Sequence, residues 1–499
     1  MPKALLSVFN KSGVVEFSRA LVDMGWELLA SGGTANMLKN AGLPVVEVAD
    51  YTGSPEILGG RVKTLHPAIH GGLLARNSAD DQAQLDSLGW GNIDLVAVNL
   101  YPFEATISKP DVSLADAIEN IDIGGVALIR AAAKNHERVT LVCDPEDYKM
   151  VVEGLRRESL TEEHRRKLAV KGFQLTSAYD LAISNYLSGE AVESLRLYPL
   201  QSLRYGENPH QQASVFGYAP HQGPLGGMVL QGKELSYNNL LDLDAAWRAA
   251  VSYSQTSVCI VKHLSPCGVA SAGTLLEAYQ AALESDPVSA FGGVVACNCE
   301  VDAETAETIS EIFVECVIAP GFSEEALEVF SKKKNLRLLK MPDTNVEPNY
   351  ELRSITRGVL KQSVDFGDPV DIEWKVATKR APTDAEWKSL RFAWKACQHI
   401  KSNAIVFCKG EATVGIGGGQ PNRVDCVRIA AQRAGEKARG AVMASDAFFP
   451  FADSVEEAAQ AGITAIIQPG GSIRDLESIE AADRLGIAMI FTGVRHFRH

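Results

Sequence analysis

The stretch Glu27-Leu-Leu-Ala-Ser-Gly-Gly-Thr34 predicts the fold of the first part of the chain. Its apolar residues fit the end of a buried β-strand, and its glycines fit a tight turn that leads into a helix. Other short apolar runs alternate with helix-like segments around it, at residues 5–9, 45–48, 93–100 and 138–143. This alternation predicts an α/β fold in which helices cover both faces of a parallel sheet.

A second α/β region follows a predicted boundary at residues 190–200, where Leu-Ser-Gly-Glu and Leu-Tyr-Pro-Leu break a helical pattern. A chain of this length usually contains more than one domain. We therefore expect one domain at residues 1–195 and a second at residues 196–499.

The second region contains a weak internal duplication. Residues 257–270 and 403–416 each predict two strands joined by a turn, and a helix follows each stretch. An aromatic loop comes next in both copies, at residues 289–293 and 445–449. We predict two related α/β halves with a connection at about residues 330–385, and a ligand cleft between the halves.

Composition and charge narrow the class of protein. The 499 residues are 46% hydrophobic and 22% charged, as in globular proteins. The net charge of -14 disfavours binding to nucleic acid, and no apolar run is long enough for a membrane span or a signal peptide. The nine cysteines include no CxxC pair, so we expect reduced thiols in a cytoplasmic protein rather than disulfides or zinc ligands.

Glycine-containing turns in the first region are candidates for binding a phosphate. Residues 31–34, Ser-Gly-Gly-Thr, fit either a phosphate site at the start of a helix or an ordinary turn. Residues 59–67 combine two glycines with Arg61, Lys63 and Thr64. This combination fits an anion-binding loop, with a plain surface loop as the alternative.

Polar residues at the ends of predicted strands and helices form a second group of candidates. Asn99 and Tyr101 end the strand at residues 93–100, and ligands of parallel sheets bind at that edge. Tyr101 is either a proton donor or a half-buried aromatic residue. Asp122 starts a helix that Lys134 ends, so a helix cap and a cation at a helix C-terminus are their structural explanations.

The second region has its own candidates. Residues 203–210, Leu-Arg-Tyr-Gly-Glu-Asn-Pro-His, are dense in polar and turn residues. Lys262 can lower the pKa of His263 and leave a neutral imidazole that accepts a proton, or the pair simply marks a strand end. Phe448 belongs to an aromatic wall that can face a flat heterocycle or form plain core. Residues 415–420 depart from GxGxxG, so no dinucleotide site is expected.

Fourteen short motifs in order along the chain resemble one family. The chain is similar to the bifunctional purine-biosynthesis family that joins phosphoribosylaminoimidazolecarboxamide (AICAR) formyltransferase to IMP cyclohydrolase. The motifs are SGGT, GGRVKTLHP, NLYPF, IDIGG and RAAAKN in the first region, and LRYGENPHQ, KHLSPCG, SAFGG, IAPGF, KSNAIV, GIGGGQ, SDAFFPF, PGGS and TGVRHFRH in the second.

The resemblance implies a methylglyoxal-synthase-like domain that closes the purine ring, followed by a duplicated, cytidine-deaminase-like transformylase region that works as a homodimer. The implied reactions are formyl transfer from the co-substrate 10-formyltetrahydrofolate to the 5-amino group of AICAR, and dehydrative closure of formyl-AICAR to IMP. Pro266-Cys267 lacks the second cysteine of the deaminase zinc motif, so no zinc is expected.

The resemblance also implies residue roles in formyl transfer. His263 would transfer the proton, and Lys262 would tune it and stabilise the tetrahedral intermediate. Asn403 would bind near the formyl group, and Asp453 would lie on the folate side. Ser402 and Asp446 would belong to a monovalent-cation site, for K+. The ribotide pocket would be lined by Arg204, Tyr205, Lys233, Asn239, Gly292, Glu315 and Arg495.

For ring closure, the resemblance implies that Lys63 stabilises the developing oxyanion and that Tyr101, Asp122 and Lys134 handle protons. The substrate would be held by Ser31, Gly32, Gly33, Thr34, Arg61, Thr64 and Asn99. Two other classes fit the first domain alone, namely a lyase acting on a triose phosphate and a nucleotide-sensing module. The lyase leaves the second region unexplained, and sensing does not need a proton-handling set.

Overall fold

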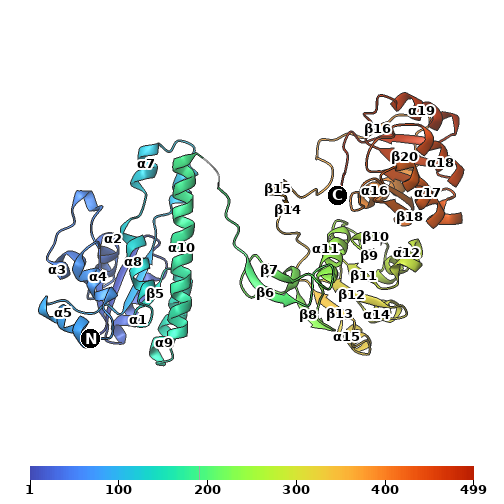
Figure 1. Cartoon of the computed structure of the whole chain (residues 1–499). Helices are drawn as coiled ribbons and strands as arrows, with labels where there is room; N and C mark the ends of the chain where they lie inside the picture. Colours follow the sequence, from blue (N-terminus) through green and yellow to red (C-terminus); the bar gives the residue numbers. More distant parts are fainter. Residues whose placement is uncertain (190–191) are drawn as a thin grey trace. The chain divides into compact units, whose positions relative to one another are not determined.

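The computed structural model describes residues 1–189 and 192–499. The chain divides into two compact units, Met1–Ser194 (unit 1) and Leu195–His499 (unit 2), as Figure 1 shows. Part of the predicted boundary stretch, residues 190–191, lies outside the described residues.

Unit 1 contains the parallel sheet that the sequence predicts. Its strand order is β3-β2-β1-β4-β5, and every neighbouring pair is parallel. The strands are β1 (Lys3–Val8), β2 (Glu27–Ala30), β3 (Val46–Glu47), β4 (Leu95–Asn99) and β5 (Thr140–Val142). The middle residues of the central strands are apolar because both faces of the sheet are buried.

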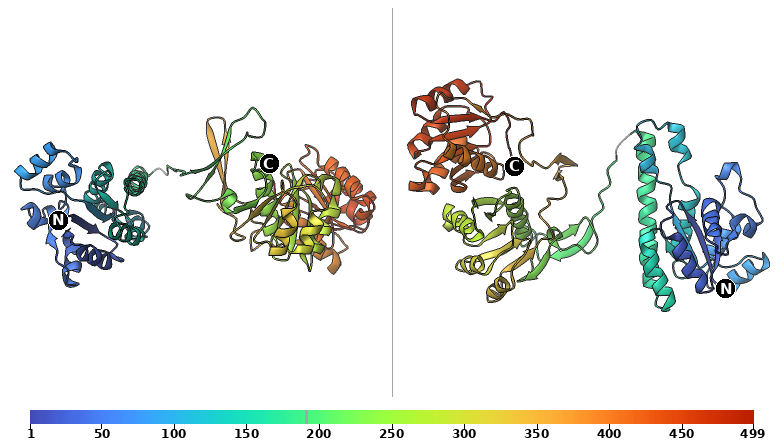
Figure 2. Two further views of the ribbon diagram at one scale, coloured as in Figure 1. Left: turned by 90° about the horizontal axis from the view of Figure 1, so that it is seen from below. Right: turned by 180° about the vertical axis from the view of Figure 1, so that it is seen from behind.

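Helices cover both faces of this sheet (Figure 2). One face packs against α1 (Val14–Asp23), α2 (Gly32–Asn40) and α9 (Tyr148–Arg156), and the other against α4 (Pro67–Leu74) and α8 (Gly124–Lys134). The long helix α10 (Glu162–Ser188) adds residues to both cores. The remaining helical segments of unit 1 are α3 (Val48–Thr52), η1 (Leu58–Gly60), α5 (Ala79–Ser87), α6 (Phe103–Ile107), α7 (Leu114–Glu119) and η2 (Pro145–Asp147).

Unit 2 is built on one mixed sheet of two halves. Equivalent strands of the two halves follow the same order from each edge to the centre. The order is β8-β13-β12-β11-β9-β10-β18-β17-β19-β20-β21-β16, with β10 and β18 paired antiparallel at the centre. Half 1 supplies β8 (Met228–Gln231), β9 (Ser257–Lys262), β10 (Ser265–Ser271), β11 (Gly293–Cys297), β12 (Val314–Ala319) and β13 (Arg337–Lys340). Half 2 supplies β16 (Lys375–Val376), β17 (Ala404–Lys409), β18 (Ala412–Gly418), β19 (Val442–Ser445), β20 (Ala465–Gln468) and β21 (Ala488–Phe491).

The helices follow the same duplication. One core contains α11 (Tyr237–Val251) of half 1 and α16 (Asp384–Cys397) of half 2. The opposite face carries α12 (Leu275–Ser285), α14 (Ala303–Ile309) and α15 (Glu324–Ser331) in half 1, and α17 (Arg423–Ala434), α18 (Asp453–Ala461) and α19 (Asp475–Arg484) in half 2. Short segments complete the unit, namely η3 (Pro224–Gly226), α13 (Pro287–Ala290) and η4 (Gly435–Ala438).

The duplication has a numerical offset of 147 over the first strands of each half, which rises to 149–151 over the later strands. β9 and β17 begin at residues 257 and 404, and β10 and β18 begin at residues 265 and 412, so the offset is 147 in both cases. The same offset relates the buried Trp247 to the buried Trp394. The predicted duplication of strands, turns and helices is therefore present in the structure.

One detail of the predicted duplication is wrong. The loop at 289–293 comes before β11, whereas the loop at 445–449 comes after β19, and β11 and β19 are equivalent strands. Both loops contain a phenylalanine next to a strand, which made them look alike in sequence. They lie at opposite ends of equivalent strands.

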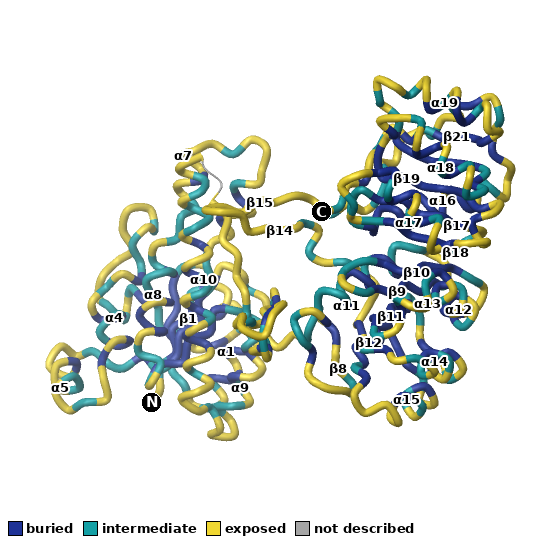
Figure 3. The backbone as a smooth tube through the Cα atoms, turned by 45° about the vertical axis from the view of Figure 1, so that its right-hand side comes forward, coloured by how far each residue is buried: buried dark blue, intermediate teal, exposed yellow. Residues whose placement is uncertain are grey.

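Two hairpins stand outside the large sheet. They are β6 (Tyr198–Leu203) with β7 (Ala213–Gly217), and β14 (Tyr350–Ile355) with β15 (Gly358–Ser363). All of β15 is exposed, including Val359 and Leu360, whereas the inner strands of the large sheet are mostly buried (Figure 3).

Candidate active site

A cleft of about 520 Å³ opens at the carboxyl ends of β1, β2 and β4 in unit 1. Parallel sheets bind ligands at this edge because loops and helix N-termini meet there. The cleft is lined by ten of the residues singled out from the sequence: Ser31, Gly32, Gly33, Thr34, Arg61, Lys63, Thr64, Asn99, Tyr101 and Asp122.

One end of the cleft is suited to a phosphate. Helix α2 begins at Gly32, and a Cβ built on Gly32 would lie 3.1 Å from Lys63 Nζ. A Cβ built on Gly33 would lie 3.7 Å from Lys11 Nζ. Two ammonium groups thus lie close to a helix N-terminus, where the partial positive charge of the helix also favours an anion.

Carboxylates neutralise the cations of this end in the absence of substrate. Glu56 lies 3.3 Å from Lys63 Nζ, and Glu119 accepts hydrogen bonds from two nitrogens of Arg61. These pairs are solvent-exposed or half-buried, so a phosphate can compete with the carboxylates for the same cations.

Asp122 also lines the cleft, two residues before the first residue of α8. Burial raises the pKa of its carboxyl above the usual value. Hydrogen bonds from the backbone N–H groups of Gly125 (2.7 Å) and Tyr101 lower the pKa, but the effect of burial is larger. The hydroxyl of Tyr179 accepts the backbone N–H of Asp122 at 2.8 Å and fixes this corner. A carboxyl with a raised pKa holds a proton more readily than an ordinary carboxyl, which suits it to proton transfer.

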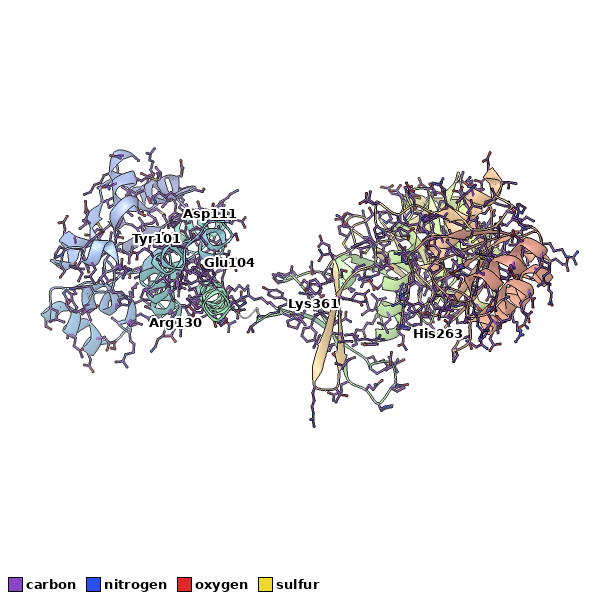
Figure 4. All side chains as sticks on the ribbon, turned by 90° about the horizontal axis from the view of Figure 1, so that it is seen from above. Tyr101, Glu104, Asp111, Arg130, His263 and Lys361 are labelled. Carbon is purple, nitrogen blue, oxygen red and sulfur yellow. The ribbon has the colours of Figure 1, made fainter. Side chains whose placement is uncertain are left out.

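Tyr101 follows β4 and lines the same cleft (Figure 4). Its ring meets Phe9 edge to face, with the ring centroids 5.5 Å apart, and 40% of the residue is exposed. This exposure leaves its hydroxyl accessible to a ligand in the cleft.

Lys134 does not line this cleft. It is the last residue of α8, so the length of this helix separates it from Asp122. It lines a second hollow with Arg130 and Phe173, and Asp122 lines this hollow as well as the cleft. At 1.5 Å per residue, ten residues of helix span about 15 Å.

In unit 2, Lys262 and His263 lie at the turn between β9 and β10. Lys262 Nζ donates a hydrogen bond of 2.6 Å to the Phe291 carbonyl oxygen. Gly292 adjoins this contact and has φ 73°, a conformation that favours glycine, although a Cβ there would meet Lys262 Nζ at an ordinary contact distance of 3.9 Å. His263 is exposed (Figure 4), so its imidazole is accessible to substrate.

The turn itself is held by a residue that the sequence did not indicate. Both His263 and Leu264 have positive φ, 55° and 62°. Asp242 of α11 accepts the N–H of His263 at 3.2 Å and the N–H of Leu264 at 2.6 Å.

Ser402, Asn403 and Asp446 form a second cluster, around the buried guanidinium of Arg423. Arg423 donates to Asp446 and, at 2.5 Å, to the side-chain oxygen of Asn403. The amide nitrogen of Asn403 donates to the carbonyl oxygens of Gln420 (2.8 Å) and Pro421 (3.1 Å). Asn403 can therefore reach a formyl group only through the remaining lone pair of its oxygen or after a change of partners.

Strand register places both clusters at the same end of the large sheet. β10 and β18 are antiparallel and pair at Ala270 and Ala412, so the start of β10 and the end of β18 lie at the same end of the sheet. Lys262 and His263 adjoin the start of β10, while Ala404 pairs with Gly418 at the end of β18.

The other predicted residues of unit 2 have varied surroundings. Asn239 accepts hydrogen bonds from Ser236 in the capping box of α11, and Glu315 is paired with Arg337. Arg204 and Arg495 lie over the rings of Tyr205 and Phe497. Lys233, Phe448 and Asp453 are exposed in the loops after β8 and β19 and at the start of α18.

The described residues include no group of three or more His, Cys, Asp or Glu side chains placed to hold a metal ion. All nine cysteines are free, and burial raises the pKa of Cys267 to about 11, which makes this thiol unreactive. At the predicted K+ position, Asp446 already accepts hydrogen bonds from Ser402, Arg423 and the N–H of Ala404, and its charge is balanced by Arg423. These side chains do not fit a cation in this arrangement. Separately, none of the described helices is long and apolar enough to cross a membrane.

Three residues near these sites were missed in the sequence analysis: Lys11, Asp242 and Arg423. Lys11 follows β1, so its position at the edge of a parallel sheet was an available signal. Asp242 and Arg423 contact residues about 20 positions away through the packing of a helix on a turn or strand, and no local pattern marks such contacts.

The fold and the sites define a class of α/β enzyme that pairs an anion-binding parallel-sheet unit with an internally duplicated unit carrying a Lys-His turn. Two family models match the chain, the "MGS-like domain" at residues 13–127 and the "AICARFT/IMPCHase bienzyme" at residues 132–433. The chain belongs to the AICARFT/IMPCHase bienzyme family.

Relatives match over the full length. A "Bifunctional purine biosynthesis protein PurH" of Halalkalibacterium halodurans is 54% identical over 100% of this chain and 99% of its own. A protein of the same name from Nostoc sp. is 52% identical over 99% of each chain. A structure titled "Crystal structure of ForH" has a TM-score of 0.36 and 34% identity, and covers 39% of this chain and 100% of its own.

The family confirms several predictions from the sequence. These are the methylglyoxal-synthase-like first domain, the mixed α/β fold, and a bifunctional purine-biosynthesis enzyme with AICAR formyltransferase and IMP cyclohydrolase activities. The cytidine-deaminase-like character of the second region stays a prediction.

Proposed function

We propose that unit 1 closes the purine ring in its cleft and that unit 2 transfers the formyl group at the β9–β10 turn. The observation that carries this assignment is the cleft of unit 1. Two lysine ammonium groups lie beside a helix N-terminus, and a carboxyl with a raised pKa lines the same cleft. A ribotide that carries a phosphate and undergoes proton transfer needs both.

Ring closure is an attack of the carboxamide nitrogen on the formyl carbon of the same molecule, followed by loss of water. Folding the substrate into a reactive shape supplies much of the rate enhancement. Lys63 stabilises the oxyanion that develops on the formyl oxygen. Asp122 and Tyr101 move the proton from nitrogen to the departing hydroxyl group. Lys134 is assigned to the same set by family resemblance. It lies outside the cleft but lines a second hollow together with Asp122, which lines both.

Formyl transfer moves the formyl group of 10-formyltetrahydrofolate to the 5-amino group of AICAR and releases tetrahydrofolate. The amine is a weak nucleophile because its lone pair is conjugated with the ring and carboxamide. His263 accepts its proton, and Lys262 stabilises the tetrahedral intermediate. Asn403 and Asp453 contact the formyl and folate groups. Guanidinium groups bind phosphate bidentately, which suits Arg204 and Arg495. The remaining ribotide contacts are Tyr205, Lys233, Asn239, Gly292, Glu315 and Phe448.

Formyl-AICAR displaces two carboxylates from the cations of unit 1. Arg61 exchanges Glu119 for the phosphate, and Lys63 exchanges Glu56 for the developing oxyanion. Ser31, Thr34, Thr64 and Asn99, together with the backbone at Gly32 and Gly33, complete the contacts.

We further propose that the enzyme is a cytoplasmic homodimer. The exposed hairpin of β14 and β15 supports this, because Leu352, Ile355, Val359 and Leu360 are all at least 40% exposed. Apolar side chains that gather on a surface usually mark an interface. No step is assigned to zinc or to K+, since Arg423 already balances the charge of Asp446.

The assignment of unit 1 is tested with a Lys63→Met variant supplied with AICAR and 10-formyltetrahydrofolate. We expect tetrahydrofolate to form at the rate of the unsubstituted enzyme, while IMP formation falls by about 10²–10³-fold and formyl-AICAR accumulates. IMP formation at the normal rate would contradict the role of the cleft. A parallel Lys39→Met variant, at an exposed lysine on α2, is the matched control and is expected to keep both rates.

A further inference from the structure

The turn between β9 and β10 is conformationally demanding. His263 and Leu264 are the one consecutive pair of non-glycine residues with positive φ in the part of the chain that the structure describes. Two-residue hairpin turns favour positive φ, but glycine and asparagine usually supply it. A histidine followed by a leucine is strained in this region, so the surrounding structure must hold the pair in place.

Asp242 is the group that holds this turn. Its carboxylate is half-buried at the surface of α11 and accepts one turn N–H on each oxygen, His263 at 3.2 Å and Leu264 at 2.6 Å. A carboxylate gives stronger hydrogen bonds than a neutral acceptor, and two bonds fix the orientation of the turn relative to the helix. The Leu264 side chain packs against the core from the same turn.

The equivalent turn in half 2 has a glycine at the position of His263 and no carboxylate at the position of Asp242. The offset of 147 places Gly410, with φ 62°, at the position of His263. It places Ser389 at the position of Asp242, where its hydroxyl donates to Ala385 O within its own helix at 3.1 Å. Glycine adopts positive φ without strain, so the turn of half 2 needs no carboxylate.

We propose that Asp242 is a positioning residue for formyl transfer. It holds the backbone of His263 in the positive-φ conformation that presents the imidazole beside Lys262, and it does so without contacting substrate. This inference rests on the proposed role of His263 as the proton acceptor. A misplacement of about 1 Å in a reacting group can cost 10²-fold in rate, so a distant hydrogen bond can control the reaction.

Asp242→Asn tests the proposal, because asparagine keeps one acceptor oxygen and puts an NH2 group against the other N–H. We expect kcat for formyl transfer to fall about 10-fold to 100-fold, while the KM for AICAR changes less than about threefold. Asp244→Asn is the matched control on the same helix, since its carboxylate is paired with Arg248 at 2.8 Å. It is expected to keep kcat within about twofold.

A double-variant cycle with Leu264→Gly separates positioning from a general structural role. Glycine adopts positive φ freely, so the loss caused by Asp242→Asn is expected to shrink by about fivefold or more in the Leu264→Gly background. An equal loss in both backgrounds would overturn the proposal. If Asp242→Asn alone does not fold, as judged by thermal unfolding, the comparison of Leu264→Gly with the double variant carries the test.

Two further outcomes are distinguishable. A kcat for Asp242→Asn equal to that of Asp244→Asn overturns the positioning role and leaves the role of His263 intact. Full formyl transfer by His263→Ala overturns the proposed function itself, and with it the reason for positioning this turn.

Discussion

The two halves of unit 2 have the same chain path but carry different residues at equivalent turns. Half 1 has Lys262 and His263 at the end of β9, and half 2 has Lys409 and Gly410 at the end of β17. The lysine is present in both copies, whereas the histidine and the carboxylate that holds it occur only in half 1. The shared fold therefore places a lysine at this turn in both halves. Only half 1 adds a histidine in a strained conformation and a carboxylate that holds it.

Both halves pack a helix closely against a strand glycine, and substituting this glycine is expected to cause a large loss of stability. Gly268 of β10 and Gly415 of β18 are equivalent, and a Cβ on either would overlap a carbonyl oxygen of the adjacent helix, Ala282 or Ala430. We expect Gly268→Ala and Gly415→Ala each to lower the free energy of unfolding by about 3 kcal/mol or more, measured by denaturant unfolding.

The control for this pair is Gly273→Ala, since a Cβ there meets nothing closer than a flexible glutamate oxygen at 3.5 Å. It is expected to change the free energy of unfolding by less than about 0.5 kcal/mol. If one of the two strand substitutions is tolerated and the other is not, the halves do not pack equivalently.

Half 2 contains a buried charged histidine, and its removal is expected to cause a smaller, pH-dependent loss of stability. His496, after the last strand of half 2, is 3% exposed and lies between Asp365 (2.6 Å) and Asp368 (2.8 Å). Burial alone would lower its pKa, but the hydrogen bonds and charges of the two aspartates raise the pKa to about 9. Because the folded pKa exceeds the unfolded value of about 6.5, the stabilisation is complete below pH 6.5 and is lost as pH rises through 9.

His496→Gln removes this charge. We expect the free energy of unfolding to fall by on the order of 2–3 kcal/mol near pH 6, and the difference from the unsubstituted enzyme to shrink toward pH 9.5. His399 stays neutral over this range, since burial lowers its pKa to about 3. A difference that does not vary between pH 6 and pH 9.5 would show that His496 is not charged in the folded protein.

The sequence predicted most of unit 1 because its sites depend on local rules. The strand at residues 27–30 and the turn after it are read from hydrophobic pattern and glycine, and the carboxyl ends of parallel strands must meet. Lys134 escaped this logic. The sequence placed it at the end of the helix that Asp122 starts, but which hollow each end of this helix lines depends on how α8 packs on the sheet.

In unit 2 the sequence indicated the duplication and the Lys-His pair but not what holds them. Asp242 contacts a turn 21 residues away through the packing of α11 on the sheet. Asn403 was expected to bind near the formyl group, and Arg423, 20 residues further on, donates a hydrogen bond to its side-chain oxygen. Contacts of this kind follow from tertiary packing, which strand and helix propensities do not encode.

We assign formyl transfer to the β9–β10 turn and ring closure to the cleft of unit 1. To separate the two reactions, the His263→Ala variant is supplied first with AICAR and 10-formyltetrahydrofolate, and then with formyl-AICAR alone. We predict a loss of about 10²–10⁴-fold in tetrahydrofolate formation and an unchanged rate of IMP formation from formyl-AICAR. Equal losses in both reactions, or no loss in either, would contradict the account.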